Sequence, residues 1–212
     1  MGRRRRGKNT YAKPDRFTRA AKDAGYVARS VFKLTEIQRR FRVLRSGDRI
    51  LDLGCSPGSW SRYAEEEVGA RGRVVGVDLD PPKDPVGEVL VADVFDVSAQ
   101  VLREALGGDA DVVMSDMAPR TTGFALRDHV CQIELAVRAF ELARELLRPG
   151  GHLITKVFDG EDAHGFVQSV RPHFAKVRRV RPEAVRRESR EFFLLCMNYQ
   201  PVPDEDQPSE SD

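Results

Sequence analysis

The sequence has few of the features that mark secreted, metal-binding or membrane proteins. Only three of its 212 residues are cysteine (Cys55, Cys131 and Cys196), and they stand far apart. An odd number of widely spaced cysteines excludes a small disulfide-built fold and favours a reducing compartment. We therefore expect a cytoplasmic protein.

Metal-binding patterns and long apolar runs are also missing. The four histidines show no metal-ligand spacing with one another or with the cysteines, so no metal centre is expected. No apolar run approaches the roughly 20 residues that a membrane-spanning helix needs. The basic start MGRRRRGKNTYAKP is not followed by the apolar segment of a secretory signal. We expect neither membrane insertion nor secretion.

Charge is abundant and unevenly distributed. The formal net charge is only +2, but residues 1–45 hold 15 Lys and Arg against 3 Asp and Glu, and residues 171–190 hold 8 against 2. Residues 46–170 hold 12 against 22, and residues 191–212 hold none against 6. Two basic blocks around an acidic middle predict that the flanks hold the phosphates of a nucleic acid. Solvated faces and a disordered arm are the alternative.

The hydrophobic pattern predicts one domain with two appendages. A chain of this length with 41% hydrophobic residues can bury one sizeable core. We predict a basic flexible arm over residues 1–20, a domain over residues 21–200 and an acidic disordered tail over residues 201–212.

Within the domain, short apolar runs alternate with segments of helical periodicity. Strands separated by single helices predict an α/β fold, a parallel sheet with helices on both faces. The predicted helices cover residues 28–41, 60–68, 99–106, 127–147 and 163–174, and the predicted strands cover residues 49–54, 73–80, 89–96, 111–119, 152–158, 175–181 and 191–199.

Charged residues at or near the ends of the predicted strands indicate a site. Ligands of parallel sheets bind beyond the carboxyl ends of the strands. A turn or a helix cap is the usual role of any one such aspartate, but together they predict one shared rim. Lys156 is unusual because lysine is rarely buried, and an edge strand whose lysine reaches water is the simpler alternative. The five residues are Asp52, Asp78, Asp93, Asp116 and Lys156.

The loop LDLGCSPGSW (residues 51–60) indicates a cofactor. Gly54 can make a tight turn, and Gly58 lets a ligand approach the backbone. The fingerprint G-x-G-x-x-G is absent, which disfavours NAD. Asp78 could accept hydrogen bonds from ribose hydroxyls, and Asp93 from an adenine amino group. An adenosine that carries a sulfonium instead of phosphates, S-adenosylmethionine, fits these features.

Asp116 and Lys156 would then face each other beside the methyl group. A ribose 2′-hydroxyl is a weak nucleophile that benefits from a base and from exact placement. Lysine can be that base when desolvation and neighbouring groups adjust its pKa.

Six segments of the sequence resemble the FtsJ/RlmE-type ribosomal-RNA ribose 2′-O-methyltransferases in order and approximate spacing. The resemblance covers roughly residues 20–200, and it implies a Rossmann-like class I methyltransferase fold, a doubly wound, seven-stranded, mostly parallel sheet whose last strand is antiparallel. The chain departs from the family pattern at CSPGSW, where AAPGGW is commoner. The segments are YVARSVFKLTEI, LDLGCSPGSWS, VVGVDL, VVMSDMAP, GGHLITKVFDG and SREFFLL.

The resemblance also implies the roles of individual residues. The Lys-Asp-Lys-Glu tetrad of the family matches Lys33, Asp116, Lys156 and Glu191, with Lys156 as the general base. The implied reaction is S-adenosylmethionine-dependent methylation of a ribose in RNA, a uridine of 23S ribosomal RNA in the large ribosomal subunit, by a monomer. The implied cofactor contacts are Gly58, Trp60, Asp78, Asp93 and Asp116.

Three alternatives remain open at this point. The same residues could methylate a ribose in transfer RNA, or the fold could serve as a non-catalytic RNA-binding module. An NAD-dependent enzyme is the third alternative.

Overall fold

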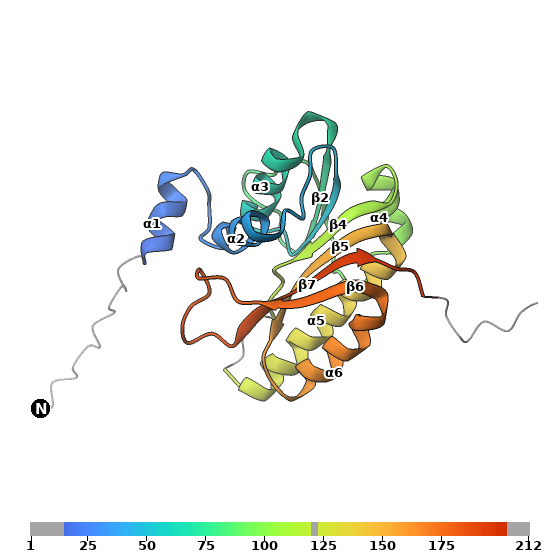
Figure 1. Ribbon diagram of the computed structural model, residues 1–212. Coiled ribbons are helices and arrows are strands. Elements are labelled where there is room, and N and C mark those ends of the chain that lie inside the picture. The colour runs from blue at the N-terminus through green and yellow to red at the C-terminus, as the bar shows by residue number, and fades with distance from the viewer. Residues whose placement is uncertain (1–14, 120–122, 203–212) are drawn as a thin grey trace, which may run out of the picture.

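The computed structural model describes residues 15–119 and 123–202, and its centre is one seven-stranded sheet (Figure 1). The strand order is β3-β2-β1-β4-β5-β7-β6. All neighbouring strands are parallel except β7, which runs antiparallel to both β5 and β6. The predicted fold, including its antiparallel last strand, is confirmed. The strands are β1 (Arg49–Leu53), β2 (Arg73–Asp78), β3 (Glu88–Val91), β4 (Ala110–Ser115), β5 (Leu147–Phe158), β6 (Phe174–Val180) and β7 (Glu191–Tyr199).

Helices cover both faces of the sheet and enclose two apolar cores (Figure 1). The helices α4, α5 and α6 bury their apolar side chains against one face, and α2 and α3 against the other. The bounds are α1 (Arg16–Asp23), α2 (Val31–Phe41), α3 (Ser59–Val68), α4 (Ala99–Leu106), α5 (Ala125–Leu146) and α6 (Glu161–Val170), with short 3-10 helices at Gly69–Arg71 and Arg171–His173.

The strand order reverses between β1 and β4, and this position determines where a ligand can bind. From β1 the chain builds outwards through β2 to β3, and from β4 it builds outwards through β5 in the opposite direction. The loops that follow β1 and β4 therefore diverge and leave space at the carboxyl rim.

The interior position of β5 explains why Lys156 is buried. This strand pairs with β4 on one side and with β7 on the other, where Lys156 lies opposite Phe193. The alternative of an edge strand is therefore wrong. Lys156 is only 4% exposed, so its ammonium depends on protein partners instead of water.

Several strand boundaries differ from the prediction, and those of β3 and β5 differ most. The strand β3 ends at Val91, so Asp93 lies two residues beyond the strand instead of closing it. The strand β5 begins at Leu147, directly after α5, and contains the turn residues Pro149-Gly150-Gly151. The pairing shifts from Ala110–Leu147 to Val112–His152, and this irregularity accommodates the extra residues.

The predicted arm over residues 1–20 overlaps a helix at its inner end. Residues 16–20 belong to α1, whose N-cap Asp15 accepts a hydrogen bond from the amide of Thr18. This helix is only eight residues long and buries only Ala21, while Phe17 packs against Phe32 of α2 with 5.8 Å between ring centroids. The remainder of the arm (residues 1–14) and most of the predicted tail (residues 203–212) lie outside the described residues. Within the described ranges, no helix is long and apolar enough to cross a membrane.

Substitutions at two neighbouring positions of α4 are expected to differ in their effect on the free energy of unfolding. Leu102 is fully buried, whereas Val101 is 46% exposed. We expect Leu102→Ala to lower the free energy of unfolding by about 2–5 kcal/mol because it leaves a cavity. Val101→Ala, the matched control, is expected to change it by less than about 0.5 kcal/mol. Urea denaturation followed by circular dichroism measures both; equal effects would contradict the assignment of α4 to the core.

Candidate active site

The loop after β1 forms one wall of the carboxyl rim. Gly54 has a φ of 77°, and a Cβ atom at this position would lie 2.5 Å from Cγ of Met117, which follows β4. Gly58, with a φ of 106°, is the N-cap of α3. Glycine is needed at Gly54 both for its backbone conformation and for the close approach of the two loops.

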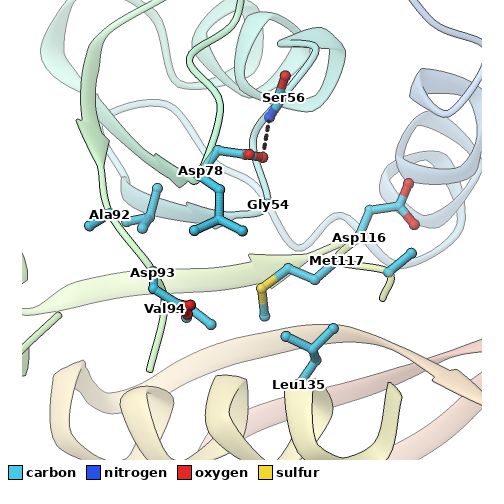
Figure 2. Close-up of a pocket in the computed structure, with 12 residues that line it drawn as sticks. Gly54, Ser56, Asp78, Ala92, Asp93, Val94, Asp116, Met117 and Leu135 are labelled. Atoms are coloured by element: carbon cyan, nitrogen blue, oxygen red, sulfur yellow. Dashed lines mark hydrogen bonds between the residues drawn. The ribbon is translucent and has the colours of Figure 1, made fainter. Parts of the chain in front are cut away.

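A cavity of about 300 Å³ opens between these loops (Figure 2). This volume is at the lower end of the range of small-molecule sites. Three of the predicted cofactor residues, Asp78, Asp93 and Asp116, line it together. The complete lining is Gly54, Ser56, Val77, Asp78, Leu79, Ala92, Asp93, Val94, Asp116, Met117, Ala118 and Leu135.

Backbone amides hold two of these carboxylates in place. Asp78 accepts hydrogen bonds from the amides of Ser56, at 2.9 Å, and Asp80, at 3.0 Å (Figure 2). Asp93 accepts one from the amide of Phe95 at 3.0 Å. Each carboxylate oxygen has two lone pairs, so both residues keep acceptor capacity that faces the cavity.

The side chain of Trp60 lies apart from this cavity. Its indole donates a hydrogen bond to the carbonyl of Ser30 at 2.9 Å and packs against Phe193, with 5.6 Å between ring centroids. Trp60 is buried and does not line the cavity. Gly58 also does not line the cavity. Cofactor contacts at Gly58 and Trp60 stay predictions.

Of the three residues that depart from the family pattern, Ser56 lines the cavity, whereas Cys55 and Ser59 do not. Ser59 accepts a hydrogen bond from the amide of Ala28 at 2.8 Å and so holds the segment before α2. Cys55 packs against Gly76, where an added Cβ would lie 2.7 Å from the sulfur. Burial, followed by the charges of Asp52 and Asp78, raises the pKa of the Cys55 thiol to about 12. Such a thiol is a poor nucleophile at neutral pH.

The four residues of the predicted tetrad meet beside the cavity. Lys156 Nζ lies 3.2 Å from Asp116 Oδ1 and donates a hydrogen bond to the Asp116 carbonyl at 2.7 Å. Lys33 Nζ lies 3.2 Å from the same Oδ1 and 2.8 Å from Glu191 Oε1. They come from β5, the end of β4, α2 and the start of β7. Asp116 also lines the cavity, so it joins the tetrad to the cofactor side.

The two lysines experience opposite effects on their pKa. Desolvation lowers the pKa of Lys156; the nearby charge of Lys33 acts in the same direction, while Asp116 and Glu191 counteract only part of the shift. For Lys33, desolvation acts downwards as well, but Asp116 and Glu191 outweigh it and raise the pKa. Lys33 therefore stays an ammonium, and Lys156 is the lysine that more readily becomes a neutral amine.

Asp52, the other aspartate of the predicted rim, lies beneath the glycine loop. It accepts a hydrogen bond from the Ser61 hydroxyl at 2.6 Å, while its Oδ1 is buried without a partner in the described part of the chain. Burial raises its pKa to about 7. It does not line the cavity, although the charges of Asp116 and Asp78 add to the rise in its pKa, so it supports the loop instead of facing a ligand.

Sequence reasoning missed the apolar wall of the cavity. Met117 follows Asp116 directly, and Leu135 reaches the cavity from the middle of α5 (Figure 2). Neither stands out in the sequence, because a leucine on an amphipathic helix is indistinguishable from a core residue. Nothing but the tertiary arrangement identifies them.

Known proteins resemble this chain over most of its length. Proteins named "Ribosomal RNA large subunit methyltransferase E" include one from Sorangium cellulosum, 45% identical over 89% of this chain and 89% of its own length. The protein of that name from Desulfatibacillum aliphaticivorans is 42% identical over 92% of this chain and 94% of its own.

Solved structures share the fold. A Plasmodium falciparum protein described as a ribosomal RNA methyltransferase superimposes with a TM-score of 0.74 at 24% identity, over 84% of this chain and all of the other. Fibrillarin from Aeropyrum pernix, solved with S-adenosyl-L-methionine bound, has a TM-score of 0.52 at 17% identity, over 73% of this chain and 68% of its own.

A family model agrees with these relatives. The model described as FtsJ-like methyltransferase matches residues 26–199, which include every strand of the sheet and all four tetrad residues. This chain belongs to the FtsJ-like methyltransferase family.

Proposed function

We propose that this protein transfers a methyl group from S-adenosylmethionine to a ribose 2′-hydroxyl of large-subunit ribosomal RNA, with Lys156 as the general base. The observation that carries the proposal is the buried contact of Lys156 with Asp116, at 3.2 Å, beside a cavity that Asp116 itself lines. A lysine that is 4% exposed and whose pKa is lowered is placed to accept a proton from a substrate next to the cofactor.

Each tetrad residue has a distinct part in this reaction. Neutral Lys156 accepts the hydroxyl proton and leaves the ribose oxygen as the nucleophile. The ammonium that forms is stabilised by the carboxylate and the carbonyl of Asp116. Lys33 links Asp116 to Glu191, so it fixes both carboxylates and, through its charge, keeps the pKa of Lys156 low.

The cavity fits S-adenosylmethionine better than a cofactor with phosphates. When bound, this cofactor supplies an electrophilic methyl carbon on a sulfonium. Three aspartates line the cavity, which suits a cationic ligand and repels phosphates. Asp78 would accept from the ribose hydroxyls, Asp93 from the adenine amino group, and Gly58 and Trp60 would contribute main-chain contacts. A Cβ at Gly54 would clash with Met117, so the loop keeps the shape of this wall.

The choice of RNA rests on the relatives. The names of the curated relatives state ribosomal RNA of the large subunit, and we extend this substrate to the present chain, with a uridine of 23S ribosomal RNA as the proposed target. A transfer RNA ribose is the second candidate, because the tetrad alone does not distinguish the two substrates. A cytoplasmic location and a monomeric state stay predictions.

The first test is removal of the base. We expect Lys156→Ala to reduce methyl transfer to undermethylated large ribosomal subunits by about 10²–10⁴-fold, the typical contribution of a general base. The binding of S-adenosylmethionine is expected to stay within about three-fold, because Asp78 and Asp93 remain in place. Tritium transfer and isothermal titration calorimetry measure the two effects.

The matched control is Lys176→Ala, which removes an exposed lysine of β6 and is expected to leave the rate unchanged. Full activity of Lys156→Ala would contradict the role of Lys156. Methylation of transfer RNA but not of subunits by the wild-type protein would favour the second candidate, and wild-type binding to RNA without methylation would favour a binding module.

The pKa directions predict the pH dependence. Since only neutral Lys156 accepts a proton, the single-turnover rate should rise with pH and level off below the ordinary lysine pKa of about 10.4. Lys33→Gln removes a cation that lowers the pKa of Lys156, so we expect the midpoint of the profile to move up by about one unit. A midpoint that stays in place or moves down would show that Lys33 does not tune Lys156.

The third test concerns the cofactor. Asp78→Asn removes a charged acceptor from the cavity, and we expect it to weaken S-adenosylmethionine binding at least about ten-fold, as charged hydrogen bonds contribute about 1.5–3 kcal/mol. The control Asp80→Asn changes a neighbouring carboxylate outside the cavity lining. Calorimetric titration with S-adenosylmethionine and with NAD measures both; NAD binding that Asp78→Asn strengthens would favour a dinucleotide enzyme instead.

A further inference from the structure

A second cavity, of about 380 Å³, lies next to the tetrad. Lys33 and Glu191 line it, whereas Asp116 lines the cofactor cavity. Because Lys33 contacts Asp116 at 3.2 Å, the tetrad lies between the two cavities. A substrate in the second cavity could therefore reach Lys156 from the side opposite the cofactor.

The two basic blocks of the sequence meet at this second cavity. Arg29, just before α2, donates a hydrogen bond to the carbonyl of Ala184, in the segment between β6 and β7, and forms an ion pair with Asp15. These contacts leave the Arg29 side chain 17% exposed and fix it in the cavity wall. The N-terminal block and the block at residues 171–190 thus form one surface beside the tetrad.

Arg186 faces this fixed guanidinium from the opposite segment. Burial and then the charge of Arg186 lower the pKa of Arg29, so the two cations are close enough to repel each other. Arg29 has Asp15 as a partner, but in residues 15–119 and 123–202 no carboxylate lies within ion-pair distance of the exposed Arg186 guanidinium. Glu188 is the one carboxylate of the described lining outside the tetrad. An anion with several oxygens would give Arg186 a partner and offset the repulsion between the two guanidinium groups.

The covalent structure of RNA supplies such an anion at this position. In a polynucleotide the 2′-oxygen is separated from the 3′-phosphorus by only four bonds, so a ribose presented to Lys156 brings a phosphate with it. We propose that Arg186, together with the anchored Arg29, binds the backbone phosphate next to the target ribose. Arg186 is thus a positioning residue, and the inference rests on the proposed function in RNA methylation.

The test compares two adjacent arginines. Arg186 lines the cavity and Arg187 does not, although both are exposed and carry the same charge. The probe is the undermethylated large ribosomal subunit, and kcat and KM are measured over a range of KCl concentrations. We expect Arg186→Ala to raise KM about ten-fold with kcat changed less than about three-fold, and to reduce the salt slope of log(1/KM) by about 0.7 to 0.9, as for one lost phosphate contact. Arg187→Ala is expected to keep KM within about two-fold.

Two results would overturn the inference, and both differ from failure of the proposed function. Equal increases of KM in Arg186→Ala and Arg187→Ala would show that the basic block acts as a diffuse field without a phosphate site. An unchanged KM in Arg186→Ala would show that the side chain contacts no phosphate. In both cases the wild-type protein still methylates RNA, whereas an inactive wild type would reject the proposed function itself. Recovery of KM in Arg186→Lys, which restores the charge, would support the phosphate contact.

Discussion

One carboxylate shared between two buried ammonium groups is the interaction on which the site depends. Asp116 Oδ1 lies 3.2 Å from both Lys33 and Lys156. Removing charged groups from water is costly unless each has partners of opposite charge. Glu191 supplies the second negative charge at 2.8 Å from Lys33, so the cluster is balanced when both lysines are charged. When Lys156 is neutral, the cluster has an excess negative charge that draws a proton towards the amine. The two carboxylates therefore stabilise the buried Lys156 in its charged form and favour proton uptake by its neutral form.

The sheet brings these groups together by its topology. Asp116 directly follows β4 and β5 carries Lys156, and these two parallel strands are direct neighbours. The antiparallel direction of β7 places its first residue, Glu191, opposite Phe158 at the same rim. A parallel strand in this position would bring its last residue there instead. The helix α2 adds Lys33 from the N-terminal side, so the site combines all parts of the domain.

The fold was predicted from strong local patterns in the sequence, and the four tetrad residues, which the structure brings together, were named from the family resemblance. Apolar runs ending in acidic residues placed Asp78 and Asp116, and the segments RSVFKL and SREFFLL placed Lys33 and Glu191 by family resemblance. The errors fell where tertiary contacts decide. Helix α1 was missed because it is only eight residues long and buries a single residue, Ala21. Strand β5 includes Pro149-Gly150-Gly151, which were predicted as a turn before the strand, because its pairing with β4 continues on both sides of the irregularity. The hydrogen bond from the Trp60 indole to the Ser30 carbonyl also could not be predicted, because no spacing in the sequence reveals it; the predicted cofactor contact of Trp60 stays a prediction.

Glu191 lies on β7, the last strand in chain order, and this has a consequence for folding during synthesis. Translation proceeds from the N-terminus, so Lys33, Asp116 and Lys156 leave the ribosome before Glu191 does. Strand β7 must also insert between β5 and β6, which are already made. A nascent chain that ended at residue 190 would have Lys33 and Lys156 with Asp116 as their single carboxylate partner. It would also lack β7, the strand that covers β5 and excludes water from Lys156. The site is therefore complete only after β7 has been made.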